Sequence, residues 1–148
     1  MILVDEYAAL PALAGRPLPA LTGDVLALTY DRTYRLTRAL LDSGRGPLGI
    51  RGRFTRLVDE LGPADRHVLI DLLADPDPAL LLIVDPRPLI RTASGIQNNY
   101  SVSMLQAETL AAAVTYDWPI RFADVASTTP SVRQAADELG LDLATIPT

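Results

Sequence analysis

Residues 103–124, SMLQAETLAAAVTYDWPIRFAD, join a helical stretch directly to a short strand. The first and fourth residues, a serine and a glutamine, have the spacing of a capping box, and most of the residues that follow are apolar around the whole helix. This pattern predicts a buried helix over 103–116 and a strand over 120–123 that ends at Asp124. A buried helix joined so closely to a strand is typical of an α/β fold with a mainly parallel sheet.

Short apolar runs alternate with helical stretches along all 148 residues, which predicts a single domain over 1–148. The expected strands cover 2–4, 25–28, 80–84, 120–123 and 141–146. The expected helices are a short one that ends between Pro11 and Pro17, followed by helices over 31–41, 50–61, 64–73, 103–116 and 131–139. Residues 94–100 contain Gly and Asn and are expected to form a polar turn.

The residue types that are missing exclude several chemistries. The sequence has no Cys, one His and no Lys, so all 13 basic residues are Arg. Disulfides, thiolate catalysis, Cys-ligated metals and lysine Schiff bases are therefore excluded. The motif LVDE at 3–6 prompts a nucleotide-binding or receiver-like interpretation, which the lack of Lys and of a Gly-rich phosphate loop disfavours.

The hydrophobic runs are too short for a membrane protein. None approaches the roughly 20 residues that span a bilayer, and the N-terminus lacks the basic residues and long apolar stretch of a signal peptide. We therefore expect a cytoplasmic protein with no membrane partner.

The formal net charge of −5 hides a basic segment. Residues 32–56 contain seven Arg and one Asp, whereas residues 57–85 contain seven acidic residues and one Arg. Guanidinium groups bind phosphates, and the rings of Tyr30, Tyr34 and Phe54 in this region are suited to stacking on unpaired bases. The segment is interpreted either as an RNA-contacting surface or as a solvated face with salt bridges to the acidic helices that follow.

Acidic residues follow two of the expected strands. Asp5 and Asp124 come directly after strands, and Glu108 is a charge in an otherwise almost entirely apolar helix. Functional groups gather beyond the carboxyl ends of parallel strands, and a cation such as Mg²⁺ or Mn²⁺ stabilises clustered carboxylates. Such a metal activates a water or holds a phosphodiester. Asp5 or Asp124 taken alone also fits a loop or capping role, as do the nearby Ser127 and Thr128.

The N-terminal ILVD and the stretch AETLAAAVTYDWPIRFAD, followed by VRQAADELGLDLATIP, resemble a PIN-domain protein, similar to the small ribonucleases of bacterial toxin–antitoxin modules. The resemblance implies a three-layer α/β domain with a five-stranded, mainly parallel sheet in the order 3-2-1-4-5. It places the family's four acids at Asp5, Asp31, Glu108 and Asp124, with Asp5, Glu108 and Asp124 as metal ligands. An ungapped count back from Asp124 instead puts Gln106 in the third position, so both alignments stay open.

The resemblance implies a Mg²⁺- or Mn²⁺-dependent endoribonuclease, the toxin of a toxin–antitoxin pair, in which metal-bound water is the nucleophile. It further implies an RNA substrate, a cognate antitoxin protein and a homodimer. The arginines expected to contact RNA are Arg32, Arg35, Arg38, Arg51 and Arg53. The alternative is a catalytically degenerate PIN-like module that binds RNA or a protein. Two residues favour it: Asp31 stands where the family usually has Glu, and Gln106 stands at the third acid position in the ungapped alignment.

Overall fold

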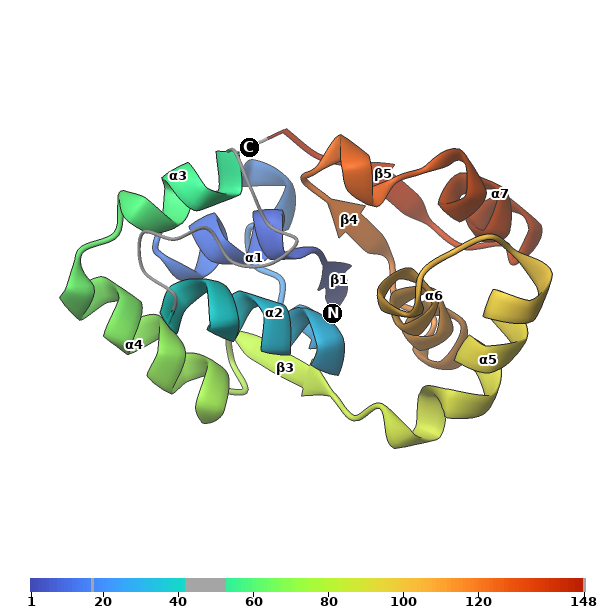
Figure 1. Ribbon diagram of the computed structural model, residues 1–148, viewed down its shortest axis with the longest axis horizontal. Coiled ribbons are helices and arrows are strands. Elements are labelled where there is room, and N and C mark those ends of the chain that lie inside the picture. The colour runs from blue at the N-terminus through green and yellow to red at the C-terminus, as the bar shows by residue number, and fades with distance from the viewer. Residues whose placement is uncertain (17, 42–52, 148) are drawn as a thin grey trace.

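The computed structural model describes residues 1–16, 18–41 and 53–147, without the side chains at 53–55 (Figure 1). The strands are β1 (Ile2–Val4), β2 (Leu26–Thr29), β3 (Leu81–Val84), β4 (Ile120–Phe122) and β5 (Leu143–Thr145). The α-helices are α1 (Glu6–Leu13), α2 (Tyr30–Leu41), α3 (Arg53–Asp59), α4 (Pro63–Ala74), α5 (Ile90–Asn99), α6 (Met104–Tyr116) and α7 (Pro130–Glu138). Three 3₁₀ turns are η1 (Pro19–Leu21), η2 (Arg87–Leu89) and η3 (Val125–Ser127).

The strands form one parallel sheet in the order β3-β2-β1-β4-β5, which confirms the predicted fold class and strand order. β1 is central, because Leu3 pairs with Ala27 of β2 on one side and with Ile120 of β4 on the other. Parallel strands cannot be joined by tight hairpins, and helices provide the crossovers between them. The carboxyl ends of all five strands therefore lie at one edge of the sheet.

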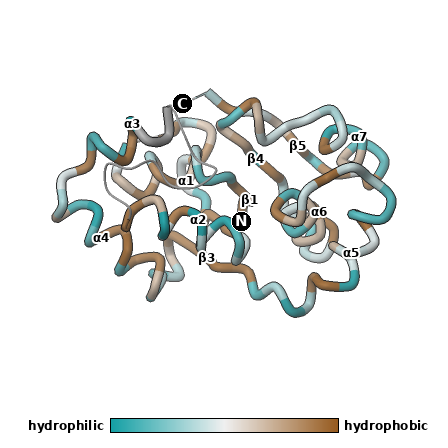
Figure 2. The backbone as a smooth tube through the Cα atoms, viewed as in Figure 1, coloured by the Kyte–Doolittle hydropathy of each residue, from teal (hydrophilic) through white to brown (hydrophobic). Residues whose placement is uncertain are grey.

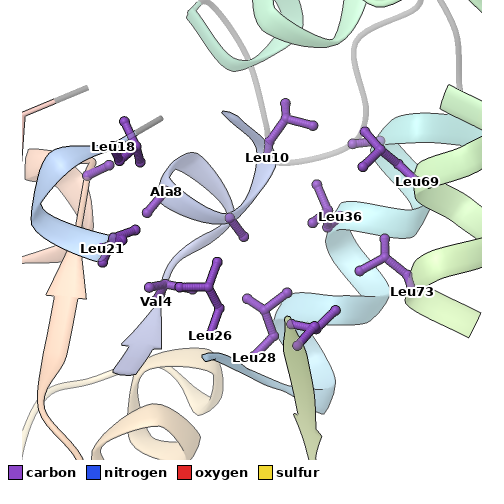
Figure 3. Close-up of a cluster of buried hydrophobic side chains, with 14 of the residues drawn as sticks. Val4, Ala8, Leu10, Leu18, Leu21, Leu26, Leu28, Leu36, Leu69 and Leu73 are labelled. Atoms are coloured by element: carbon purple, nitrogen blue, oxygen red, sulfur yellow. The ribbon is translucent and has the colours of Figure 1, made fainter. Parts of the chain in front are cut away.

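Side chains alternate along each strand, so the sheet has two separate cores. Ile2 and Val4 of β1 belong to a buried cluster that includes residues of α1, α2 and α4 (Figure 3). Leu3 belongs to a second cluster, with Phe122 of β4 and residues of α5, α6 and α7. Figure 1 shows α1–α4 and α5–α7 as two separate groups of helices. Because helices cover both faces, the strands appear in the sequence as continuous apolar runs.

The expected polar turn at 94–100 is wrong, because these residues lie mostly within α5. Ile96 is 4% exposed and packs in the second cluster, and this burial outweighs the weak helix propensity of Gly95 and the asparagines. Within the described residues, no helix combines the length and the apolar character that a membrane crossing requires.

Candidate functional site

A cleft opens at the carboxyl edge of the sheet, where β1 and β4 end beside the first turns of α2. Its volume is about 230 Å³. The polar side chains in its wall include Glu6, Arg32, Arg35, Gln106, Asp124 and Ser127. Acids and arginines thus share the place where the sequence predicted a cluster of acids.

Asp5 follows β1, is fully buried, and accepts hydrogen bonds with both oxygens. Oδ1 accepts from the N–H groups of Ala8 at 2.9 Å and Ala123 at 3.1 Å. Oδ2 accepts from the N–H of Asp124 at 3.0 Å and from the hydroxyl of Ser127 at 2.9 Å. A carboxylate offers about four lone-pair positions, and these four donors use them. Asp5 therefore caps α1 and ties β1 to the loop after β4.

Arg32 forms a buried ion pair with Glu6. Its Nη1 lies 2.8 Å from Glu6 Oε2, and the two side chains are only 2% and 3% exposed. Arg32 Nε donates to Thr109 Oγ1 at 2.9 Å, and the guanidinium carbon lies 4.9 Å from the centroid of the Phe122 ring. A hydrogen bond, an ion pair and an aromatic face together fix the position of this guanidinium.

The charge of Arg32 also acts on Asp5. Burial raises the pKa of Asp5 above the ordinary value of 3.8, while hydrogen bonds from the backbone of Asp124 and Ala123 and the positive charge of Arg32 oppose this rise. Arg32 therefore neutralises Glu6 directly and also favours the ionised form of Asp5, whose two oxygens are held by four protein donors.

The predicted exposure of Arg32 is wrong. Arg32 was expected to contact RNA together with Arg35 and Arg38, but it lies on the buried face of α2 with Leu36 and Ala39. Glu6, its partner, was not singled out from the sequence. A second carboxylate directly after a strand-terminal acid was the available signal, because a buried charge needs a partner of opposite sign.

Glu108 and Asp31 meet at the start of α2. Glu108 Oε1 accepts from the N–H of Asp31 at 3.3 Å, so α6 supplies a cap for α2. Glu108 is 8% exposed, and its burial raises its pKa above the ordinary 4.5. The negative charge of Asp31 adds to this rise, and hydrogen bonds from the backbone of Asp31 and Tyr30 oppose it.

The cleft wall contains Gln106, whereas Glu108 contacts the start of α2. Gln106 and Ser103 form the predicted capping box: the Gln106 N–H donates to Ser103 Oγ at 3.2 Å, and the Ser103 N–H donates to Gln106 Oε1 at 3.0 Å. Asp124 accepts from the N–H of Ala126 at 3.2 Å and so caps η3. Each of the three predicted metal ligands, Asp5, Glu108 and Asp124, thus accepts at least one hydrogen bond from the protein.

Mg²⁺ and Mn²⁺ need several oxygen ligands with free lone pairs around one point. Over residues 1–16, 18–41 and 53–147, no three His, Cys, Asp or Glu side chains converge in this way. Asp5 accepts four protein donors, and Glu6 pairs with Arg32. Protein groups thus occupy both oxygens of Asp5 and Oε2 of Glu6, whereas Glu6 Oε1 is buried without a hydrogen bond from any described residue. Metal dependence stays a prediction from the resemblance.

The other arginines of α2 lie closer to solvent. Arg35 is half-buried in the cleft wall, with its Nε 3.8 Å from Glu6 Oε1. Arg38 is exposed, and its guanidinium carbon lies 6.0 Å from the centroid of the Tyr34 ring. Tyr30 and Tyr34 are 55% and 56% exposed. This outer face of α2 combines aromatic rings with a positive charge.

Two of the arginines expected to contact RNA fall outside the side chains that the structure describes. Arg51 lies outside the described residues, as does the side chain of Arg53 on α3. Their predicted role stays a prediction.

No family model matches the chain, and no curated protein matches it. Its relation to the PIN domain accordingly stays a prediction.

Proposed function

We propose that this chain is a PIN-like module that binds single-stranded RNA and in which an internal arginine takes the place of a metal ion. The observation that carries the proposal is the guanidinium of Arg32, buried 2.8 Å from Glu6 at the edge where the predicted acids gather. Arg stays protonated in proteins, so this charge is permanent. It neutralises Glu6 and favours the charged form of Asp5 without a divalent cation, and the proposed module holds RNA without cutting it.

The outer face of α2 supports RNA as the ligand. Tyr30, Tyr34 and Arg38 are spaced four residues apart and so follow one side of the helix. Stacking of a base on an exposed aromatic ring contributes about 1–3 kcal/mol. Besides the buried Arg32, the segment 32–56 carries six Arg against one Asp, a positive charge that attracts a phosphodiester chain despite the net charge of −5.

Fluorescence anisotropy with a labelled single-stranded RNA tests RNA binding. Tyr34→Ala is expected to weaken binding by roughly tenfold, because it removes one stacking platform. Tyr116→Ala is the matched control, since Tyr116 is also exposed but lies on α6, and it is expected to leave the affinity unchanged. Equal binding by both variants, or no binding by the wild type, would contradict RNA as the ligand.

The metal-dependent endoribonuclease is the second candidate, favoured by the acids at the strand ends. Incubating the same RNA with the wild type and Mg²⁺ or Mn²⁺ separates the two functions, and the proposal expects the RNA to stay intact. Cleavage that is abolished by Asp124→Asn but retained by Asp137→Asn, a change at an exposed residue of α7, would establish the nuclease instead. The roles of a toxin and of a cognate antitoxin stay predictions that depend on this activity.

A further inference from the structure

β3 is an edge strand whose outer side carries backbone groups suited to pairing. On its inner side, the N–H of Leu26 in β2 donates to the carbonyl of Leu80 at 3.0 Å. Backbone groups point alternately to the two sides of a strand, so those of Leu81 and Ile83 face outward. The Leu81 N–H donates to the Asp77 carbonyl at 3.0 Å. Ile83 therefore presents both a donor and an acceptor to the outer edge.

The residues of this edge are apolar. Residues 78–84, PALLLIV, carry no charge, and Leu80 is 50% exposed. Figure 2 shows β3 as a hydrophobic segment of the chain. A hollow of about 380 Å³ lies beside the strand, lined by Met1, Pro76, Pro78, Leu81, Leu82 and Ile83. Edge strands commonly carry a charge, a proline or a bulge that prevents pairing, and Leu81–Val84 contains neither charge nor proline.

Charges of opposite sign flank the two ends of β3. Asp75 and Asp77 precede the strand. After it, Arg87 pairs with Asp85 at 2.6 Å, and the exposed Arg91 leaves an excess of positive charge. A second copy in antiparallel orientation brings the acidic start of each strand next to the basic end of the other, whereas a parallel copy brings like charges together. This complementarity favours a second copy of the chain as the partner.

We propose that two copies of the chain associate through this edge, with β3 antiparallel to β3 about a two-fold axis at Ile83. Two residues opposite each other in an antiparallel pair exchange both N–H···O bonds, which matches the donor and acceptor that Ile83 presents. A two-fold axis makes the surface complementary to itself. The two five-stranded sheets then continue into one another. The pairing does not depend on whether the chain binds RNA.

Light scattering after size exclusion, over a dilution series, tests this pairing. The wild type is expected at twice 15.9 kDa, and Ile83→Pro at 15.9 kDa, because proline removes the outward N–H and leaves the bonds to β2 in place. Ile83→Thr, which keeps the N–H and a β-branched side chain, is the matched control and is expected to stay dimeric. Circular dichroism shows whether Ile83→Pro keeps its fold. A wild-type monomer, or a folded Ile83→Pro dimer, would overturn the proposal.

A charge reversal provides a second test that leaves the strand unchanged. Arg91→Glu is expected to weaken the dimer by roughly tenfold, because it puts a negative charge next to the aspartates of the other copy. Arg133→Glu makes the same charge change at an exposed residue of α7 and is expected to have no effect. Equal dimer dissociation constants for the two variants would show that the charged ends of β3 do not meet, which contradicts the antiparallel arrangement.

Discussion

Arg32 and Arg38 lie on the same helix, about 120° apart around its axis, in opposite environments. Arg32 is 2% exposed, pairs with Glu6 and packs against Phe122. Arg38 is exposed and lies over the ring of Tyr34. The difference teaches that one residue type serves two purposes in α2: the buried arginine is a counter-ion for the acids of the sheet edge, and the exposed one is available to a ligand.

The largest effect is expected at the buried position. Arg32→Leu leaves Glu6 without its counter-ion in the interior, and breaking a buried ion pair in this way destabilises proteins by about 3–5 kcal/mol. Urea denaturation followed by circular dichroism measures the free energy of unfolding.

Adding Glu6→Gln to Arg32→Leu is the control for this effect. Because it removes the unpaired charge, the double variant is expected to regain part of the lost stability. A loss below about 1 kcal/mol for Arg32→Leu alone would show that Arg32 is not the counter-ion.

A pH-dependent effect is expected at Glu108, a buried carboxylate that accepts a hydrogen bond from the Asp31 N–H. Burial raises its pKa above 4.5, so the folded protein binds more protons than the unfolded chain as pH rises above that value. The contribution of Glu108 to stability is therefore complete below pH 4.5 and falls as pH rises through the folded pKa. Glu108→Gln keeps an acceptor for the Asp31 N–H but cannot ionise.

Urea denaturation of Glu108→Gln and the wild type over a range of pH measures this effect. The stability of the variant relative to the wild type is expected to increase from pH 4.5 towards neutrality. A difference that stays constant over that range would show that the folded environment does not disfavour the charge of Glu108.

The smallest effect on stability is expected at the exposed position. Arg38→Leu should change the free energy of unfolding by no more than about 0.5 kcal/mol, as is usual for surface substitutions. It should nevertheless weaken RNA binding. The slope of the logarithm of the affinity against the logarithm of the salt concentration should become shallower by about 1, as for the loss of one phosphate contact. Arg133→Leu on α7 is the control for both measurements. A large loss of stability in Arg38→Leu would remove the contrast with Arg32.

The fold could be predicted because its signals are local. The run of apolar residues in α6 and the short apolar strands specify a parallel sheet covered on both faces. α5 could not be predicted in the same way, because its sequence is rich in weak helix formers. The packing of Ile96 against the second cluster stabilises it, and that contact is not visible in a local pattern.

The site was predictable only in part. Asp5 and Asp124 do meet at the edge of the sheet, as their positions after two strands indicated. The partner of Glu6 was not predictable, because it depends on which side of α2 faces the sheet. An error of a fraction of a turn in the predicted orientation of this helix groups Arg32 with the exposed arginines. The interpretation of the acids near Arg32 then changes, because its ion pair with Glu6 is missed.

Calorimetric titration of Mn²⁺ into the wild-type protein tests most directly whether an arginine has replaced the metal. The expected result is no binding heat that depends on the acids of the cleft, because Arg32 already pairs with Glu6 and four protein donors already occupy Asp5. Binding of one or more Mn²⁺ ions that Asp124→Asn abolishes and Asp137→Asn preserves would contradict this account.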